Sequence, residues 1–121
     1  MQKRVLVADD ASFMRELIKD ILVKQGYQIV AEAVSGDDAV KKYREHRPDI
    51  ITMDIVMNDK NGIEATREIM SFDPNARILV VSALGNQGMV VEAIQAGAKG
   101  FIIKPFRAEV LIEEVIRVVG E

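Results

Sequence analysis

The chain has 121 residues, of which 49% are hydrophobic and 29% charged, a composition typical of one soluble globular domain and unlike that of a disordered segment. The net charge of −3 disfavours direct binding of nucleic acid, and the absence of cysteine excludes disulfides and thiolate metal sites. With no apolar run near the roughly 18 residues of a membrane span and no recognisable leader, we expect a cytoplasmic protein whose single domain covers residues 1–121.

The first predicted unit is a buried strand followed by an amphipathic helix. The apolar run Arg4–Ala8 predicts the strand, which ends at two adjacent carboxylates, Asp9 and Asp10. Gly26 is expected to end the helix, because glycine adopts a positive φ at little cost. The helix itself is indicated by apolar residues at helical spacing: Phe13, Leu17, Ile18, Ile21 and Leu22.

The second and third units repeat this order. A strand at Ile29–Ala33 precedes Ser35 and Asp38, which have the spacing of a capping box with Asp in place of Glu, and Pro48 ends the helix that they begin. The third strand, Ile50–Met53, runs directly into Asp54. The third helix is expected to start near Gly62 and to end before Asp73-Pro74.

The remaining elements are a strand at Ile78–Ala83, a helix at about Gln87–Ala96 that stops at Gly97, a strand at Gly100–Lys104 and a final helix at Ala108–Val119. Strand and helix thus alternate five times. Nearly continuous apolar strands are typical of a parallel sheet covered on both faces, and crossovers between parallel strands are right-handed. The sequence therefore predicts a single doubly wound α/β domain with five strands and five helices.

Polar side chains are predicted at the carboxyl ends of four strands, where open α/β sheets bind their ligands. These are Asp9 and Asp10, then Asp54, Ser82 and Lys104. Carboxylates brought together resist ionisation unless a cation lies among them. Oxygen ligands without His or Cys favour Mg²⁺, with Mn²⁺ as a substitute.

Four segments in this order resemble the receiver domain of response regulators, most closely its stand-alone chemotaxis members: "VADDASFMR", "DIITMDIVM", "ILVVSA" and "GAKGFIIKPF". The resemblance runs from about Lys3 to Val119. It implies a flavodoxin-like fold with strand order 2-1-3-4-5, an order that we take from the family rather than from the residues.

The resemblance also implies roles for the acidic residues. Asp54 matches the phosphoacceptor, which is phosphorylated in a Mg²⁺-dependent reaction. Asp10 matches a direct metal ligand and Asp9 a ligand that acts through water. The backbone carbonyl of Val56 would complete the protein's share of the metal site, together with Asp54.

The other strand ends match the phosphate-binding and switch residues of the family. Ser82, the amide of Ala83 and Lys104 would bind the phosphoryl group, with Ser82 and Lys104 completing the catalytic set. Ser82 and Phe101 match the switch pair, with a plain core residue as the alternative for Phe101. The Lys104–Pro105 peptide bond is expected to be cis.

The implied function is that of a phosphoacceptor signalling protein, not of an enzyme beyond its own phosphorylation and dephosphorylation. A histidine kinase of the chemotaxis type would donate the phosphoryl group, and a flagellar motor switch protein or another chemotaxis component would bind the face of Gln87–Ala96, Gly100–Lys104 and Ala108–Val119. A phosphatase is a further expected partner; nucleic acid and membrane are not. We expect a monomer, with a phosphorylation-dependent dimer as the alternative.

Two features depart from the family pattern. Asn58 stands where proline is usual and is followed by Asp59 and Lys60, so we expect a more mobile turn. We expect Asp59 to be solvated, with an effect on metal affinity or contact with a partner as the alternatives. Val56 and Leu84, two residues beyond Asp54 and Ser82, are apolar, and we expect them to slow the hydrolysis of the phosphoryl group.

Other interpretations stay open at this point. The chain could be a receiver taken from a longer regulator with a DNA-binding or enzymatic output domain. The pair Asp9-Asp10 could simply cap a helix, where carboxylates suit the positive end of the dipole. A haloacid-dehalogenase-type phosphatase would need an Asp in place of Val56, and a nucleotide or flavin binder would need a Gly-rich loop in place of "DDASF". The only histidine, His46, is interpreted as a surface residue.

Overall fold

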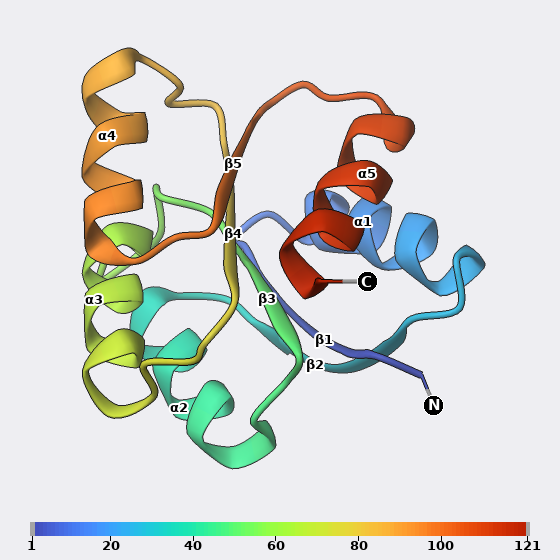
Figure 1. Cartoon of the computed structure of the whole chain (residues 1–121), viewed down its shortest axis with the longest axis horizontal. Helices are drawn as coiled ribbons and strands as arrows, with labels where there is room; N and C mark the ends of the chain where they lie inside the picture. The colour runs from blue at the N-terminus through green and yellow to red at the C-terminus, as the bar shows by residue number, and fades with distance from the viewer. Residues whose placement is uncertain (1, 121) are drawn as a thin grey trace.

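The computed structural model describes residues 2–120, in which strands and helices alternate along the chain (Figure 1). Within these residues, no helix combines the length and the apolar character needed to cross a bilayer. The strands are β1 (Arg4–Ala8), β2 (Gln28–Ala33), β3 (Ile50–Met53), β4 (Ile78–Ser82) and β5 (Gly100–Ile103). The helices are α1 (Ser12–Lys24), α2 (Gly36–His46), α3 (Gly62–Phe72), α4 (Gln87–Ala96) and α5 (Ala108–Val119). The expected strand bounds are confirmed to within one residue.

The five strands form one parallel sheet in the order β2-β1-β3-β4-β5, which confirms the predicted fold. Helices α1 and α5 cover one face of the sheet, and α2, α3 and α4 cover the other (Figure 1). From β1 the chain moves outward to β2, whereas from β3 it moves in the opposite direction to β4 and β5. This reversal lies between β1 and β3, and it opens a crevice at the carboxyl ends of these two strands.

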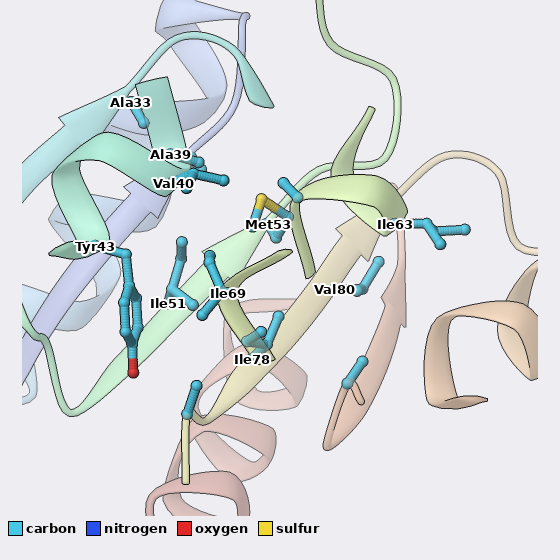
Figure 2. Close-up of a cluster of buried hydrophobic side chains, with 14 of the residues drawn as sticks. Ala33, Ala39, Val40, Tyr43, Ile51, Met53, Ile63, Ile69, Ile78 and Val80 are labelled. Atoms are coloured by element: carbon cyan, nitrogen blue, oxygen red, sulfur yellow. The ribbon is translucent and has the colours of Figure 1, made fainter. Parts of the chain in front are cut away.

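The sheet divides the hydrophobic core into two layers. Successive strand residues point to opposite faces, so Ile51 and Met53 of β3 pack with Ile69 of α3 in one layer (Figure 2), while Ile50 packs in the other. Both layers are well filled, and β3 and β4 are buried along their whole length. This double burial explains why the strands are nearly continuous apolar runs.

The predicted helix ends are confirmed, with one difference in the capping of α2. Gly26 and Gly97 have φ values of +90° and +120°, as expected where glycine ends a helix. The Ser35 hydroxyl accepts a hydrogen bond from the Asp38 amide at 3.1 Å. The Asp38 carboxylate, however, accepts from the Val34 amide and not from Ser35, because Asp is one methylene shorter than the usual Glu.

The outer edge of the sheet at β2 is partly closed by a side chain of α2. The Ala33 carbonyl accepts from the Asp9 amide and therefore faces β1, so the preceding carbonyl, that of Glu32, faces away from the sheet. The Lys42 ammonium donates a hydrogen bond to this Glu32 carbonyl at 2.6 Å.

Candidate functional site

The register of β1 and β3 brings two carboxylates to the same level of the crevice. Ala8 lies opposite Met53 in the ladder, and Asp9 and Asp54 follow directly after this pair. The Asp54 amide donates to the Ala8 carbonyl at 3.0 Å, which extends the ladder by one bond into the site. The backbone of both Asp9 and Asp54 is therefore held in place by the sheet.

Strands β4 and β5 deliver the hydroxyl and the ammonium in the same way. Ser82 lies opposite Ile103, and the Lys104 amide donates to the Ser82 carbonyl at 2.9 Å. The Lys104–Pro105 peptide bond is cis, as expected. All the predicted strand-end residues thus meet at one edge of the sheet.

Asp9 is buried, with every polar group engaged. Its amide donates to the Ala33 carbonyl, one carboxylate oxygen accepts from the Ala11 amide at 2.9 Å, and the other lies 2.7 Å from the Lys104 ammonium. The interpretation of Asp9 and Asp10 as helix caps is wrong, because α1 begins after Ala11 without a side-chain capping bond. A buried carboxylate with an ion-pair partner is instead typical of a functional or structural charge cluster.

Asp9, Asp10 and Asp54 form a cluster in which one carboxylate oxygen from each lies within 4.8 Å of the others. Asp10 is exposed, whereas Asp9 and Asp54 are buried. Three convergent carboxylate oxygens without nitrogen or sulfur ligands fit a hard divalent cation, and Mg²⁺ prefers one or two carboxylates with water and substrate oxygens. These residues therefore fit the predicted metal, while the part of the Val56 carbonyl stays a prediction.

Lys104 connects two members of this cluster. Its ammonium lies 2.7 Å from Asp9 and 3.4 Å from Asp54, and the side chain is only 15% exposed. From the family resemblance we expected Lys104 to bind an incoming phosphoryl group, and its closer ion pair with Asp9 was not predicted. The two residues are 95 positions apart, and only the order of the strands shows that they meet.

The environment of Asp54 changes its acidity. Burial raises the pKa of the Asp54 carboxyl, because a desolvated carboxylate is less stable than its neutral form, and the nearby Lys104 charge partly opposes this effect. The Asp9 charge raises the pKa further. Asp54 is therefore a poorly solvated carboxylate beside a cation, which distinguishes it from an ordinary loop residue.

The two predicted switch residues lie in different surroundings. Ser82 is fully buried at the end of β4, where its hydroxyl oxygen accepts from the Leu84 amide at 3.2 Å, and Ala83 begins the exposed loop that follows. Phe101 is partly buried on β5 and packs against the core layer under α2, α3 and α4. Their roles in binding phosphate and in switching stay predictions.

The turn after β3 is anchored to the start of α2. Asn58 forms an isolated bridge with Ser35, and Lys60 pairs with Asp37 at 3.1 Å and with Glu68. Asp59 has a φ of +61°, and its carboxylate accepts from backbone amides of this region instead of joining the acidic cluster. The sequence did not predict these bonds, and the expectation that the turn is more mobile without the usual proline stays a prediction.

Two hydrogen bonds of Arg15 beside the site were not predicted from the sequence. Arg15 of α1 donates to the backbone carbonyl of Asp9 at 2.8 Å and to the Glu32 carboxylate at 3.0 Å. The only sequence signal is that Arg15 and Lys19 are four residues apart, so they share one helix face, and both pair with Glu32.

The sequence matches the family model described as response regulator receiver domain over residues 5–116. It is 56% identical to the chemotaxis protein CheY of Thermotoga maritima over 118 residues, which cover 98% of each chain. It is also 56% identical to CheY of Bacillus subtilis over 115 residues, covering 95% of this chain and 96% of the relative.

The structure is similar to CheY in the crystal structure of a CheX–CheY–BeF₃–Mg complex from Borrelia burgdorferi. The TM-score is 0.95 at 36% sequence identity, with 98% of this chain and 90% of the other covered. A longer relative, the protein-glutamate methylesterase/protein-glutamine glutaminase of Haloarcula marismortui, is 46% identical, and the match covers 84% of this chain but 28% of that protein.

Proposed function

The chain belongs to the response regulator receiver family and is closely related to CheY, and from this membership we propose that it accepts a phosphoryl group on Asp54 from a histidine kinase. The observation that carries the proposal is the meeting of Asp54 with Asp9, Asp10 and Lys104 at one sheet edge. A scaffold would not need this combination of charges.

The proposed reaction uses the Asp54 carboxylate as a nucleophile. One of its oxygens forms a bond to phosphorus as the bond between phosphorus and the donor's imidazole nitrogen breaks, and the imidazole leaves with the electron pair. The buried position of Asp54 leaves its oxygens poorly solvated. Removal of water around the carboxylate favours attack, because less solvation has to be lost in the transition state.

The neighbouring residues would stabilise the charge of the transferring group. Lys104 already lies 3.4 Å from Asp54 and would offer its ammonium to a phosphoryl oxygen, while the Ser82 hydroxyl and the Ala83 amide would donate hydrogen bonds. Asp9, Asp10 and Asp54 would hold Mg²⁺, with the Val56 carbonyl as a further ligand. Bound Mg²⁺ would supply positive charge for the phosphoryl oxygens.

Phosphorylation would be signalled through the face formed by α4, β5 and α5. The Ser82 side chain would move towards the phosphoryl group, and the Phe101 side chain would move into the space that Ser82 leaves. Phosphorylation would thereby shift the equilibrium between two conformations of this face. This face exposes large apolar side chains, as an interaction surface does. They are Val91, Ile94, Ile103 and Val110, each between 43% and 51% exposed.

The partner of this face would be a flagellar motor switch protein or another chemotaxis component, and a phosphatase would end the signal. The relationship to CheY supports this choice. The alternative is a receiver from a longer regulator, which the partial match to the methylesterase favours. Capture of partners with phosphorylated and unphosphorylated protein distinguishes these outcomes.

The central test is labelling by acetyl phosphate. The wild type is expected to gain one phosphoryl group only when Mg²⁺ is present, and Asp54→Asn is expected to gain none, as mass spectrometry of the intact protein would show. Asp59→Asn is the matched control, because Asp59 lies outside the acidic cluster, and it should label like the wild type. Labelling of Asp54→Asn at the wild-type rate would refute the proposal, and continuous release of phosphate would indicate a phosphatase.

A further inference from the structure

A side chain that the proposed phosphoryl chemistry does not use holds the peptide between Asp9 and Asp10. The Arg15 guanidinium donates from Nη1 to the Asp9 carbonyl at 2.8 Å and from Nε to the Glu32 carboxylate at 3.0 Å. Its side chain is 15% exposed and that of Glu32 is 35% exposed, so these bonds are partly buried. Arg15 therefore connects the edge strand β2 to the point where β1 enters the acidic cluster.

This contact bears directly on Asp10. The Asp9 carbonyl belongs to the same planar peptide unit as the nitrogen and Cα of Asp10, so fixing that oxygen also fixes the N–Cα bond from which the Asp10 side chain extends. The Asp10 side chain is exposed, and within residues 2–120 no hydrogen bond or ion pair engages it. The backbone is therefore the part of Asp10 that hydrogen bonds can position.

Glu32 in turn holds the guanidinium in place. Its other carboxylate oxygen lies 2.8 Å from the Lys19 ammonium, and the hydrogen bonds from Lys19 and Arg15 keep the pKa of the Glu32 carboxyl below its usual range. The next residue, Ala33, accepts the Asp9 amide. Strand β2 thus holds Asp9 from both sides, through Ala33 at its N–H and through Glu32 and Arg15 at its carbonyl.

We infer that Arg15, oriented by Glu32, is a positioning residue for divalent-cation binding, which holds the Asp10 carboxylate towards Asp9 and Asp54. The inference rests on the proposed function, since it assumes that the acidic cluster binds Mg²⁺. Arg15 is a cation itself, so its charge alone disfavours a second cation nearby. Arg15 can strengthen Mg²⁺ binding only by positioning Asp10. Its charge and its positioning of Asp10 therefore change the Mg²⁺ affinity in opposite directions.

The test compares Mg²⁺ affinities by isothermal titration calorimetry. Arg15→Lys keeps the charge but loses the planar fork that reaches two acceptors at once, so we expect about tenfold weaker binding, as for other residues that orient metal ligands. Arg67→Lys is the matched control on the exposed side of α3 and should bind like the wild type. Arg15→Lys within twofold of the wild type would overturn the inference.

A second variant covers the case in which Arg15→Lys does not fold. Arg15→Gln removes the charge, which alone would tighten Mg²⁺ binding, so equal or weaker binding supports positioning and tighter binding overturns it. The wild type separates the two proposals: if it binds no Mg²⁺ and takes up no label, the proposed function fails. If it binds Mg²⁺ and is labelled on Asp54 while Arg15→Lys binds equally well or Arg15→Gln binds more tightly, only the role of Arg15 fails.

Discussion

Asp54 is a buried carboxylate that shares the Lys104 ammonium with Asp9, and its raised pKa affects stability. The folded state binds the Asp54 proton more tightly than the unfolded state does. Stability of the metal-free protein therefore falls as pH rises from the unfolded-state pKa through the folded-state pKa, and the destabilisation is fully present above that window.

Asp54→Asn removes this charge and should increase the free energy of unfolding at pH 7 by more than about 0.5 kcal/mol, the usual range of surface substitutions, with the gain disappearing below the ordinary carboxyl pKa. Urea unfolding in EDTA at pH 7 and at low pH measures the difference. The control Glu92→Gln, at an exposed residue of α4, should stay within about 0.5 kcal/mol of the wild type at both pH values. A less stable Asp54→Asn at pH 7 would show that the ion pair with Lys104 outweighs desolvation.

At the level of single residues, the sequence located the site but not its pairings. Asp54, Ser82 and Lys104 could be assigned to one edge because each ends a strand that is apolar throughout. The ion pair between Lys104 and Asp9 depends on which strands are neighbours, and the bond from Arg15 to the Asp9 carbonyl depends on the angle at which α1 crosses the sheet. Neither the order of the strands nor the crossing angle of α1 can be predicted from a local sequence pattern.

Among the elements, the start of α2 and the turn after β3 form one joined structure. Gly36 allows this approach, because a Cβ at this position would lie 1.9 Å from the Lys60 carbonyl oxygen. Gly36→Ala should therefore push the turn away and lower the free energy of unfolding by about 2 kcal/mol, the usual range for overpacking, as urea unfolding would measure.

Gly88→Ala provides the comparison for Gly36→Ala, since it is the same change in the first turn of another helix. The nearest atom to its added Cβ is the Asn86 side-chain oxygen at 3.3 Å, and the gain in helix propensity is at most about 1 kcal/mol. If Gly36→Ala and Gly88→Ala have equal free energies of unfolding, the turn after β3 moves away from α2 without loss of stability, which would contradict the prediction.

The elements themselves could be predicted well because their signals are local. Strands buried on both faces are apolar runs, and helix ends carry residues such as Ser35, Gly26 and Gly97. The anchoring of Asp59 and Lys60 to α2 was missed, because it joins loops from different strands and the turn lacks the proline that would have suggested rigidity.

For the whole molecule, the reversal of strand order between β1 and β3 places the site where many elements meet. The sequence predicted a doubly wound sheet, but the order of its strands came from the family resemblance, since alternation of strands and helices fits several orders. Ligand binding at such a junction should stabilise the entire fold, because all the ligand-bearing residues extend from core strands.

Mg²⁺ at about 100 times its Kd should raise the free energy of unfolding by about 2.7 kcal/mol, and EDTA should reverse the gain. Thermal unfolding with and without the ion measures this effect. Asp10→Asn is expected to abolish most of this Mg²⁺-dependent gain in the free energy of unfolding. As a control, a buffer of the same ionic strength that contains no divalent cation should leave the stability of the wild type unchanged. A Tm that does not respond to Mg²⁺ in the wild type would contradict a metal site at the acidic cluster.

The bond from Lys42 to the Glu32 carbonyl has a consequence beyond phosphoryl transfer. An open β-strand is a template on which another chain can add its own strand, and such addition leads to swapped dimers and fibres. Here an added strand would first have to displace the ammonium from the outward-facing oxygen of β2. We therefore expect Lys42 to disfavour the addition of a strand at this oxygen of β2.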